Sequence, residues 1–215
     1  MFKLQGTLIP LGVDVLTEII SGLVSIAIAY YAFKCYTLIK ESPLFYLNLS
    51  FSLLAAGFLT HGVVKARILV LATIRHKPPL PIKFLGEVSF AYMICFIAQA
   101  SAYLLLIYAY LRQTKWLAEA APALLLVLKE YDQPTEAILF FLMTILVSQA
   151  SINYSARKTS GALLVLTGFS LMAVSHLLFI FVSLGPKMLV AAGIARLLGF
   201  LSLLTMLLRA GRGGR

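Results

Sequence analysis

The chain has 215 residues, of which 61% are hydrophobic and 12% are charged, whereas a soluble domain carries about 25% charged residues. This composition excludes a soluble globular protein, because one core of this length could not bury so much apolar surface, and it predicts that the lipid bilayer is the solvent. The net charge of +10 does not indicate nucleic-acid binding, because the basic residues lie at the ends of apolar runs, where membrane proteins anchor to headgroups.

Six apolar runs are long enough to cross a bilayer, which requires about 20 helical residues. A seventh run, at 116–128, lies between Lys115 and Lys129 and carries Glu119 and Pro122 in its first turns. We interpret it as a short spanning helix, the alternative being a helix that lies at the membrane interface. The six long runs lie at 13–39, 43–66, 84–111, 134–156, 161–183 and 187–208.

The second half of the chain repeats the first, without a gap, at a shift of 118 positions (135 minus 17). In an apolar chain, such a match is typical of a membrane bundle built from two related halves. The third helix of each half matches at a smaller shift of 97 (196 minus 99), because part of the connection at 65–83 is missing from the second half. The matched positions are Thr17-Glu18 with Thr135-Glu136, Tyr36 with Tyr154, Lys40 with Lys158, and Phe51-Ser52-Leu53 with Phe169-Ser170-Leu171.

These elements predict an all-α, polytopic transmembrane bundle of seven helices that forms a single domain over 1–215. The predicted order is three helices, one short linker helix and three helices, in a parallel repeat. The first repeat covers 13–112, the linker helix 114–130 and the second repeat 132–209.

Lys and Arg residues set the predicted orientation, because the inner segments of membrane proteins carry an excess of them. With the N-terminus outside, nine of these residues fall on inner segments and eight on outer segments. Five of the eight belong to the connection at 65–83, so the remaining bias favours the N-terminus outside and the C-terminus inside. We therefore expect a multi-pass protein of the cell membrane with this topology.

Ionisable residues within spanning helices are costly, so each one indicates a functional or structural partner. Arg196 falls near the middle of the last predicted helix. Glu18 and Glu136, at equivalent positions of the two repeats, are its predicted partners. One interpretation is an ion pair that fixes the last helix against 13–39 or 134–156. The alternatives are a site for an anionic ligand or a route for a proton.

His61 and His176 fall in the outward halves of corresponding helices, about one helical turn apart in the repeat alignment. Such a pair suits haem ligation, metal binding or proton transfer. Two separate histidines, each hydrogen-bonded to a neighbouring helix, are the plainer interpretation. We expect no haem, because Val174, Leu177 and Leu178 crowd His176.

Further polar residues within the predicted helices would line a central cavity together with these groups. Cys35 and Cys95 lie in apolar runs and are predicted to be buried thiols rather than metal ligands,. No metal, cofactor or catalytic residue is predicted, because the sequence lacks a phosphate-binding glycine loop, a His-Glu-x-x-His motif and a serine nucleophile elbow. The predicted ligand-site residues are Glu18, His61, Gln99, Glu136, Gln149, His176 and Arg196.

The order of three helices, one helix and three helices resembles that of the small sugar transporters and the wider PQ-loop group. Gln133-Pro134 stands before a helix, in the reverse order of the Pro-Gln pair that defines this group. The chain also resembles the seven-helix sensor modules of prokaryotic signalling proteins, in the runs Ser175-His176-Leu177-Leu178 and Gly199-Phe200-Leu201. The first resemblance implies solute transport and the second implies sensing, and neither transfers a site residue.

We interpret the chain as a non-enzymatic ligand-binding or sensing bundle. Two alternatives stay open, a small solute transporter and an accessory membrane subunit of a larger complex, for example a respiratory one. The lipid bilayer is the expected partner, with a small-molecule ligand and membrane proteins as further candidates. Nucleic acid is not expected.

Overall fold

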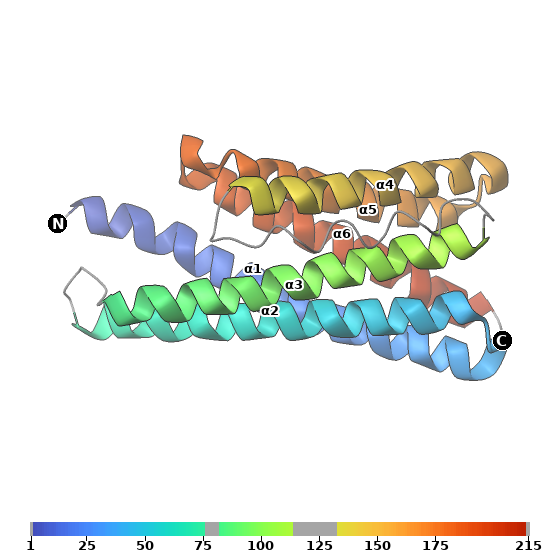
Figure 1. The fold of residues 1–215 in the computed structure, drawn as a ribbon, viewed down its shortest axis with the longest axis horizontal. Coiled ribbons are helices and arrows are strands. Elements are labelled where there is room, and N and C mark those ends of the chain that lie inside the picture. Colours follow the sequence, from blue (N-terminus) through green and yellow to red (C-terminus); the bar gives the residue numbers. More distant parts are fainter. Residues whose placement is uncertain (1, 76–81, 114–132, 214–215) are drawn as a thin grey trace.

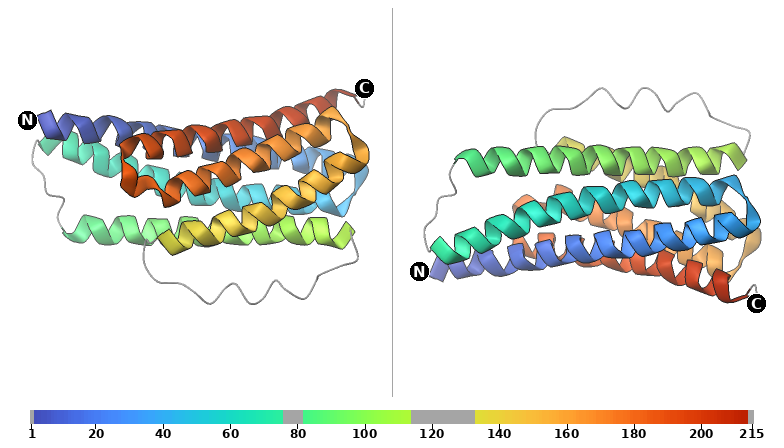
Figure 2. Two further views of the ribbon diagram at one scale, coloured as in Figure 1. Left: turned by 90° about the horizontal axis from the view of Figure 1, so that it is seen from above. Right: turned by 90° about the horizontal axis from the view of Figure 1, so that it is seen from below.

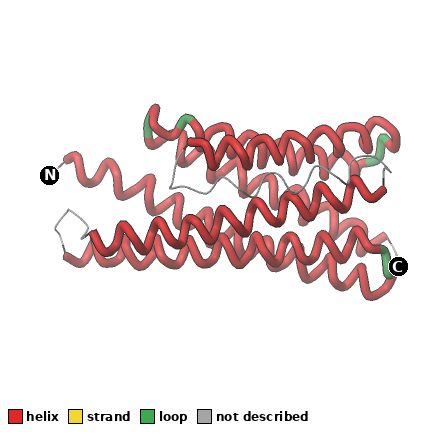
Figure 3. Tube along the Cα trace, viewed as in Figure 1, coloured by secondary structure: helices red, strands yellow, loops and turns green. Residues whose placement is uncertain are grey.

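The computed structural model describes residues 2–75, 82–113 and 133–213, which are helical apart from short turns (Figure 1, Figure 3). Each of the six α-helices contains an apolar span of 21 to 30 residues, long enough to cross a membrane. The prediction of an all-α, multi-pass membrane bundle is confirmed. The elements are α1 (Phe2–Ile39), α2 (Ser42–Arg75), α3 (Ile82–Gln113), α4 (Gln133–Arg157), α5 (Ser160–Ile180), the 3₁₀ helix η2 (Val182–Leu184) and α6 (Pro186–Gly213).

The described residues hold six spanning helices rather than the predicted seven. The predicted short helix at 114–130 lies outside the described residues. Five of the six α-helices are also longer than the apolar runs predict, and α2 continues to Arg75 instead of ending near 66; α5 instead ends at Ile180, short of the predicted 183. The sequence between 66 and 75 contains neither glycine nor proline, so nothing in it interrupts a helix where the apolar run ends.

The six α-helices form a closed ring in which each packs against its neighbours along the chain. The ring closes because α6 packs against α1, and α3 packs against α4. The helices α1, α3, α4 and α6 run in one direction, and α2 and α5 run in the other (Figure 1, Figure 2). Each half therefore follows the same order and direction. We call the end of the bundle at which α1 and α4 finish the hairpin end.

The two helix turns at the hairpin end share one backbone geometry. Lys40 follows α1 with φ 60°, and Lys158 follows α4 with φ 48°. Each lysine N–H donates to the carbonyl of a tyrosine on the preceding helix, Tyr36 or Tyr154, at 2.8 Å. A left-handed residue after the last helical turn is a common helix cap. In this bundle, Lys40 reverses the chain direction between α1 and α2, and Lys158 does so between α4 and α5.

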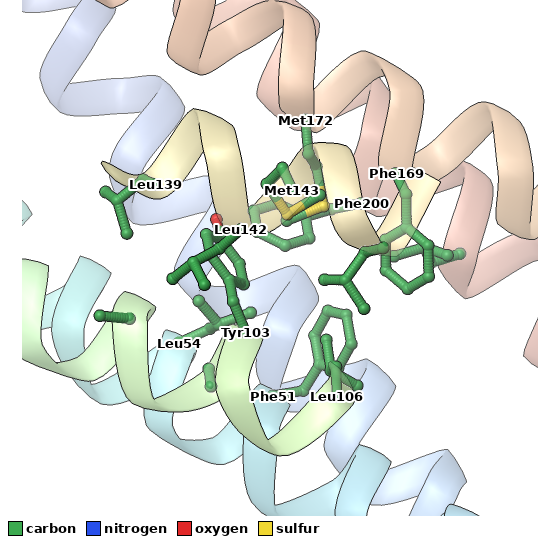
Figure 4. Packing of buried hydrophobic residues seen from close by; sticks show 14 of the residues in the cluster. Phe51, Leu54, Tyr103, Leu106, Leu139, Leu142, Met143, Phe169, Met172 and Phe200 are labelled. Atoms are coloured by element: carbon green, nitrogen blue, oxygen red, sulfur yellow. The ribbon is translucent and has the colours of Figure 1, made fainter. Parts of the chain in front are cut away.

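An apolar core fills the ring and is rich in aromatic side chains (Figure 4). Phe200 of α6 contacts two rings of α2 edge-on, Phe51 at 5.9 Å and Phe58 at 5.6 Å between centroids. Such edge-to-face pairs add about 0.5–1.5 kcal/mol each beyond the burial of area. Since α2 and α6 lie on either side of α1 in the ring, these contacts join two helices that are not direct neighbours through side chains in the core.

The helices α5 and α6 approach each other closely at two facing glycines. A Cβ added to Gly199 would lie 2.8 Å from the carbonyl oxygen of Gly168, and one added to Gly168 would lie 2.7 Å from Leu203 Cγ. Small residues allow helix backbones in a membrane to come this near. The contact sets the separation of α5 and α6, and it lies within one helical turn of Arg196.

Gly199→Ala is expected to lower the melting temperature of the purified protein in detergent, because the new methyl group meets backbone atoms of α5. Overpacking of this kind costs about 1–3 kcal/mol. Gly211→Ala is the matched control, since Gly211 lies on the same helix with nothing within 4 Å of the added carbon. Equal melting temperatures for the two variants would contradict the close contact.

Candidate functional site

Four acidic or basic side chains of α1 and α2 meet inside the bundle. Asp14 and Glu18 lie four residues apart on α1, and His61 and Lys65 lie four residues apart on α2, so each pair shares one helix face,. Lys65 Nζ lies 2.6 Å from Asp14 Oδ2 and 3.0 Å from Glu18 Oε1. His61 Nδ1 lies 3.1 Å from the same Glu18 oxygen. The two carboxylates are only 1% and 3% exposed, so the two Lys65 contacts are buried ion pairs, and the His61 contact is a buried hydrogen bond.

Glycines bring α1 and α2 close enough for these contacts. A Cβ added to Gly62 would lie 3.0 Å from Ile19 Cγ1, and one added to Gly22 would lie 2.8 Å from Leu59 Cγ. Gly62 directly follows His61, so the close approach occurs where the ion pairs form. The short carboxylate side chains can therefore reach across the interface.

A second carboxylate–histidine pair lies between α4 and α5. Glu136 Oε2 lies 2.8 Å from His176 Nδ1, and α3 supplies a hydroxyl group to each partner. The Tyr92 hydroxyl donates to Glu136 Oε1 at 3.1 Å, and the Tyr103 hydroxyl lies 2.9 Å from His176 Nε2. Both ring nitrogens of His176 are therefore engaged, and neither could ligate a haem iron without losing a hydrogen bond.

Arg196 of α6 lies inside the ring and is 4% exposed. Its Nη2 is 3.9 Å from Glu18 Oε1, and its guanidinium carbon lies over the rings of Phe58, at 4.7 Å, and Phe179, at 5.2 Å. A desolvated cation–π contact is worth about 2 kcal/mol, which offsets part of the cost of burial. Among the described residues, Nε and Nη2 of Arg196 have no hydrogen-bond partner.

Tyr92 joins the two carboxylate–histidine pairs. Its ring packs edge-on against His61, with centroids 5.7 Å apart, while its hydroxyl contacts Glu136. Every α-helix except α3 supplies an acidic side chain, a basic side chain or a histidine to this region, and α3 supplies two tyrosines. We define the charged cluster as Asp14, Glu18, His61, Lys65, Glu136, His176 and Arg196.

Five of the seven residues predicted from the sequence lie in the charged cluster, and the other two do not take part in its hydrogen bonds or ion pairs. Gln99 is buried on α3 and donates to Cys95 Sγ at 3.2 Å. Gln149 is half-buried on α4. The five that come together are Glu18, His61, Glu136, His176 and Arg196.

Sequence reasoning missed Asp14 and Lys65. The prediction assigns Lys65 to the outer connection at 65–83, but α2 continues to Arg75, so Lys65 is a helical residue that pairs with α1. The sequence does carry a signal for both residues. An acidic pair and a His–Lys pair, each spaced by four residues, lie on consecutive helices, and such spacing places each pair on one helix face.

Within residues 2–75, 82–113 and 133–213, no group of three or more His, Cys, Asp or Glu side chains is arranged to hold a metal ion. The geometry of the cluster accounts for this around α1. Asp14 and Glu18 lie close together, but the ammonium group of Lys65 contacts both of them and takes the place that a cation would need.

A cavity of about 320 Å³ lies at the hairpin end, and none of the predicted site residues lines it. Residues from α2 to α6 and from the turn after α1 form its wall, so both halves contribute. The wall is mainly apolar and includes Leu47, Phe169 and Leu203, with Glu41 and Arg157 as its charged members. The sequence could not predict this cavity, because its apolar lining residues look like any other helix-packing residues.

Comparison of the chain with protein-family models, with curated proteins and with solved structures finds no match. The resemblances to sugar transporters and to sensor modules therefore stay expectations from the sequence. A functional assignment rests on the charged cluster and the cavity.

Arg196→Leu is expected to lower the stability of the bundle by about 3–5 kcal/mol, the usual cost of removing one partner of a buried ion pair. The physical reason is that the buried Glu18 carboxylate loses the nearby positive charge of Arg196. Thermal unfolding of the purified protein in detergent measures the change. Arg209→Leu, an exposed position on the same helix, is the control, and a melting temperature as low as that of Arg196→Leu would argue against the buried pair. Adding Glu18→Gln to Arg196→Leu should restore part of the loss.

Proposed function

We propose that the chain is a non-enzymatic membrane bundle that senses a small amphipathic molecule by binding it in the hairpin-end cavity. The observation that carries this proposal is the cavity of about 320 Å³ between the two halves. Small-molecule sites occupy roughly 300–1,000 Å³ and are found between the helices of bundles. The architecture supports the proposal, because residues from both halves would contact one ligand.

The lining of the cavity favours a zwitterionic ligand with an apolar body. Leu47, Phe169 and Leu203 supply apolar contacts, while Glu41 and Arg157 bring opposite charges from the turns of the two halves. Neither of these charged residues forms an ion pair within the described ranges. A ligand carboxylate or phosphate would therefore bind Arg157, and a ligand ammonium group would bind Glu41.

The proposed orientation, with the N-terminus outside, is supported by Lys65, because this residue lies inside the bundle and not in an outer connection. Its Nζ pairs with Asp14 and Glu18. Without Lys65, outer segments hold seven Lys and Arg residues (8 minus 1) against nine on inner segments,. The cavity at the hairpin end would then face the interior of the cell.

A small solute transporter is the second candidate, and the shared order and direction of the helices in the two halves favour it. The halves share helix order and direction, and the Lys40 and Lys158 turns are alike. This is the expectation for two copies of one unit related by an axis along the membrane normal, as in several transporter folds. Transport would require the ligand to pass the aromatic contacts of Phe51 and Phe58 with Phe200.

Binding to the purified chain in lipid nanodiscs tests the proposal, with two probes that share the zwitterionic, amphipathic chemistry. Radiolabelled leucine represents an apolar amino acid, and lysophosphatidylethanolamine represents a single-chain lipid. We expect one of them to bind, and Arg157→Gln or Glu41→Gln to weaken binding about tenfold, since a hydrogen bond to a charged group contributes about 1.5–3 kcal/mol.

Lys158→Gln is the matched control, because Lys158 is an exposed neighbour of Arg157 that does not line the cavity. It should leave binding unchanged. Failure of both probes to bind the wild-type chain, or an equal loss in Lys158→Gln, would contradict the proposed site. Uptake of the bound probe into proteoliposomes would favour the transporter over the sensor.

A further inference from the structure

The charged cluster contains more acid than base. In the described ranges it holds three carboxylates, Asp14, Glu18 and Glu136, and two permanent cations, Lys65 and Arg196. With both histidines neutral, its formal charge is −1 (2 minus 3). One bound proton therefore makes the cluster neutral.

The surroundings of the cluster make this surplus charge costly. The Glu136 side chain is 12% exposed and that of His176 is 2% exposed, while Asp14, Glu18 and Arg196 are 1%, 3% and 4% exposed, and all lie within spanning segments. Water screens such groups only weakly, and an uncompensated charge at this depth is strongly unfavourable. An imidazole titrates close to neutral pH, so taking up a proton on a histidine costs much less than leaving the surplus charge in place.

The geometry shows which of the two histidines faces the surplus negative charge. Around α1, Asp14 and Glu18 face Lys65, and Arg196 lies 3.9 Å from Glu18, so two acids meet two bases. Glu136 differs, because within the described residues His176, at 2.8 Å, is its only ion-pair partner in direct contact, and Arg196 acts on it only at longer range. The surplus negative charge therefore belongs to Glu136.

We infer that Glu136 and His176 form a binding site for a single proton, held as an imidazolium on His176 against the Glu136 carboxylate. When the proton is bound, Nδ1–H donates to Glu136 Oε2 and Nε2–H donates to the Tyr103 hydroxyl oxygen, along contacts of 2.8 Å and 2.9 Å. On release, the Nε2 proton leaves for water, His176 keeps Nδ1–H, and the Tyr103 hydroxyl turns to donate to Nε2. One proton moves, and the cluster changes from neutral to −1.

Every helix around this pair supplies a group that could compete for the proton or repel it. None of these groups lines the hairpin-end cavity, so proton binding is a property separate from the proposed ligand binding. The surrounding groups are Asp14 and Glu18 on α1, His61 and Lys65 on α2, Tyr92, Cys95 and Tyr103 on α3, and Arg196 on α6.

Nitrogen NMR of histidine-labelled protein in nanodiscs tests the inference directly. The chain has three histidines, so a His76→Gln background leaves His61 and His176 as the reporters. We expect one imidazolium and one neutral imidazole at neutral pH. Glu136→Gln removes the surplus charge, and His176 should then release its proton at a pH lower by about one unit or more, a tenfold or greater loss of proton affinity.

Three further variants make the assignment decisive. His61→Gln and the charge-conserving Tyr92→Phe should keep the imidazolium signal, whereas His176→Gln should abolish it. Two neutral histidines throughout the neutral range would overturn the inference. So would an imidazolium that disappears in His61→Gln, or a His176 whose titration does not change in Glu136→Gln.

A thermal measurement covers the case in which His176→Gln does not fold. The bound proton stabilises the folded state, so this stability is present at low pH and is lost as pH rises past the point of release. The melting temperature of the wild-type chain should fall over that range, and Glu136→Gln should flatten the dependence. A wild-type melting temperature that rises over the same range would also overturn the inference.

Discussion

An unpaired charge at the centre of a bilayer costs about 2.5–3.5 kcal/mol even on insertion scales, and the bundle is organised around meeting this constraint. Lys65 joins α2 to α1, Arg196 joins α6 to α1, and His176 joins α5 to α4. Tyr92 then connects α3 to both carboxylate–histidine pairs. Each ionisable group thus binds its own helix to a neighbour, and together they connect the whole ring.

These polar contacts have a role that apolar packing cannot fill in a membrane. Lipid tails are as apolar as leucine, so a helix that slides along its neighbour by one turn loses little free energy through burial alone. An ion pair such as Lys65 with Asp14 is lost by the same movement, and two buried charges are left without partners,. The cluster therefore sets the relative depth of the helices, while the Gly168–Gly199 contact and the aromatic core set their separation.

Composition and apolar runs were sufficient to predict the six described spans, because a bilayer imposes a minimum length that the sequence must show. The partner of Arg196 is predictable as Glu18 or Glu136, since a buried arginine requires a carboxylate and few are available, and the structure pairs it with Glu18. The place of Lys65 is not predictable in this way, because hydropathy cannot tell a charged residue in a loop from one paired inside a helix. The cavity depends on how Leu47, Phe169 and Leu203 are arranged in three dimensions, which the order of residues does not encode in any local pattern.

The pairing of Arg196 with Glu18 also bears on how the protein is made. These residues lie 178 positions apart (196 minus 18), so α1 is synthesised long before α6 leaves the ribosome. Glu18 reaches the membrane early and already has Lys65 as a partner once the adjoining α2 is in place. Arg196 arrives in the last helix and gains its carboxylate only when α6 closes the ring against α1. Insertion of the last segment is therefore more favourable after the first hairpin has assembled, because Arg196 then meets a carboxylate at its own depth,.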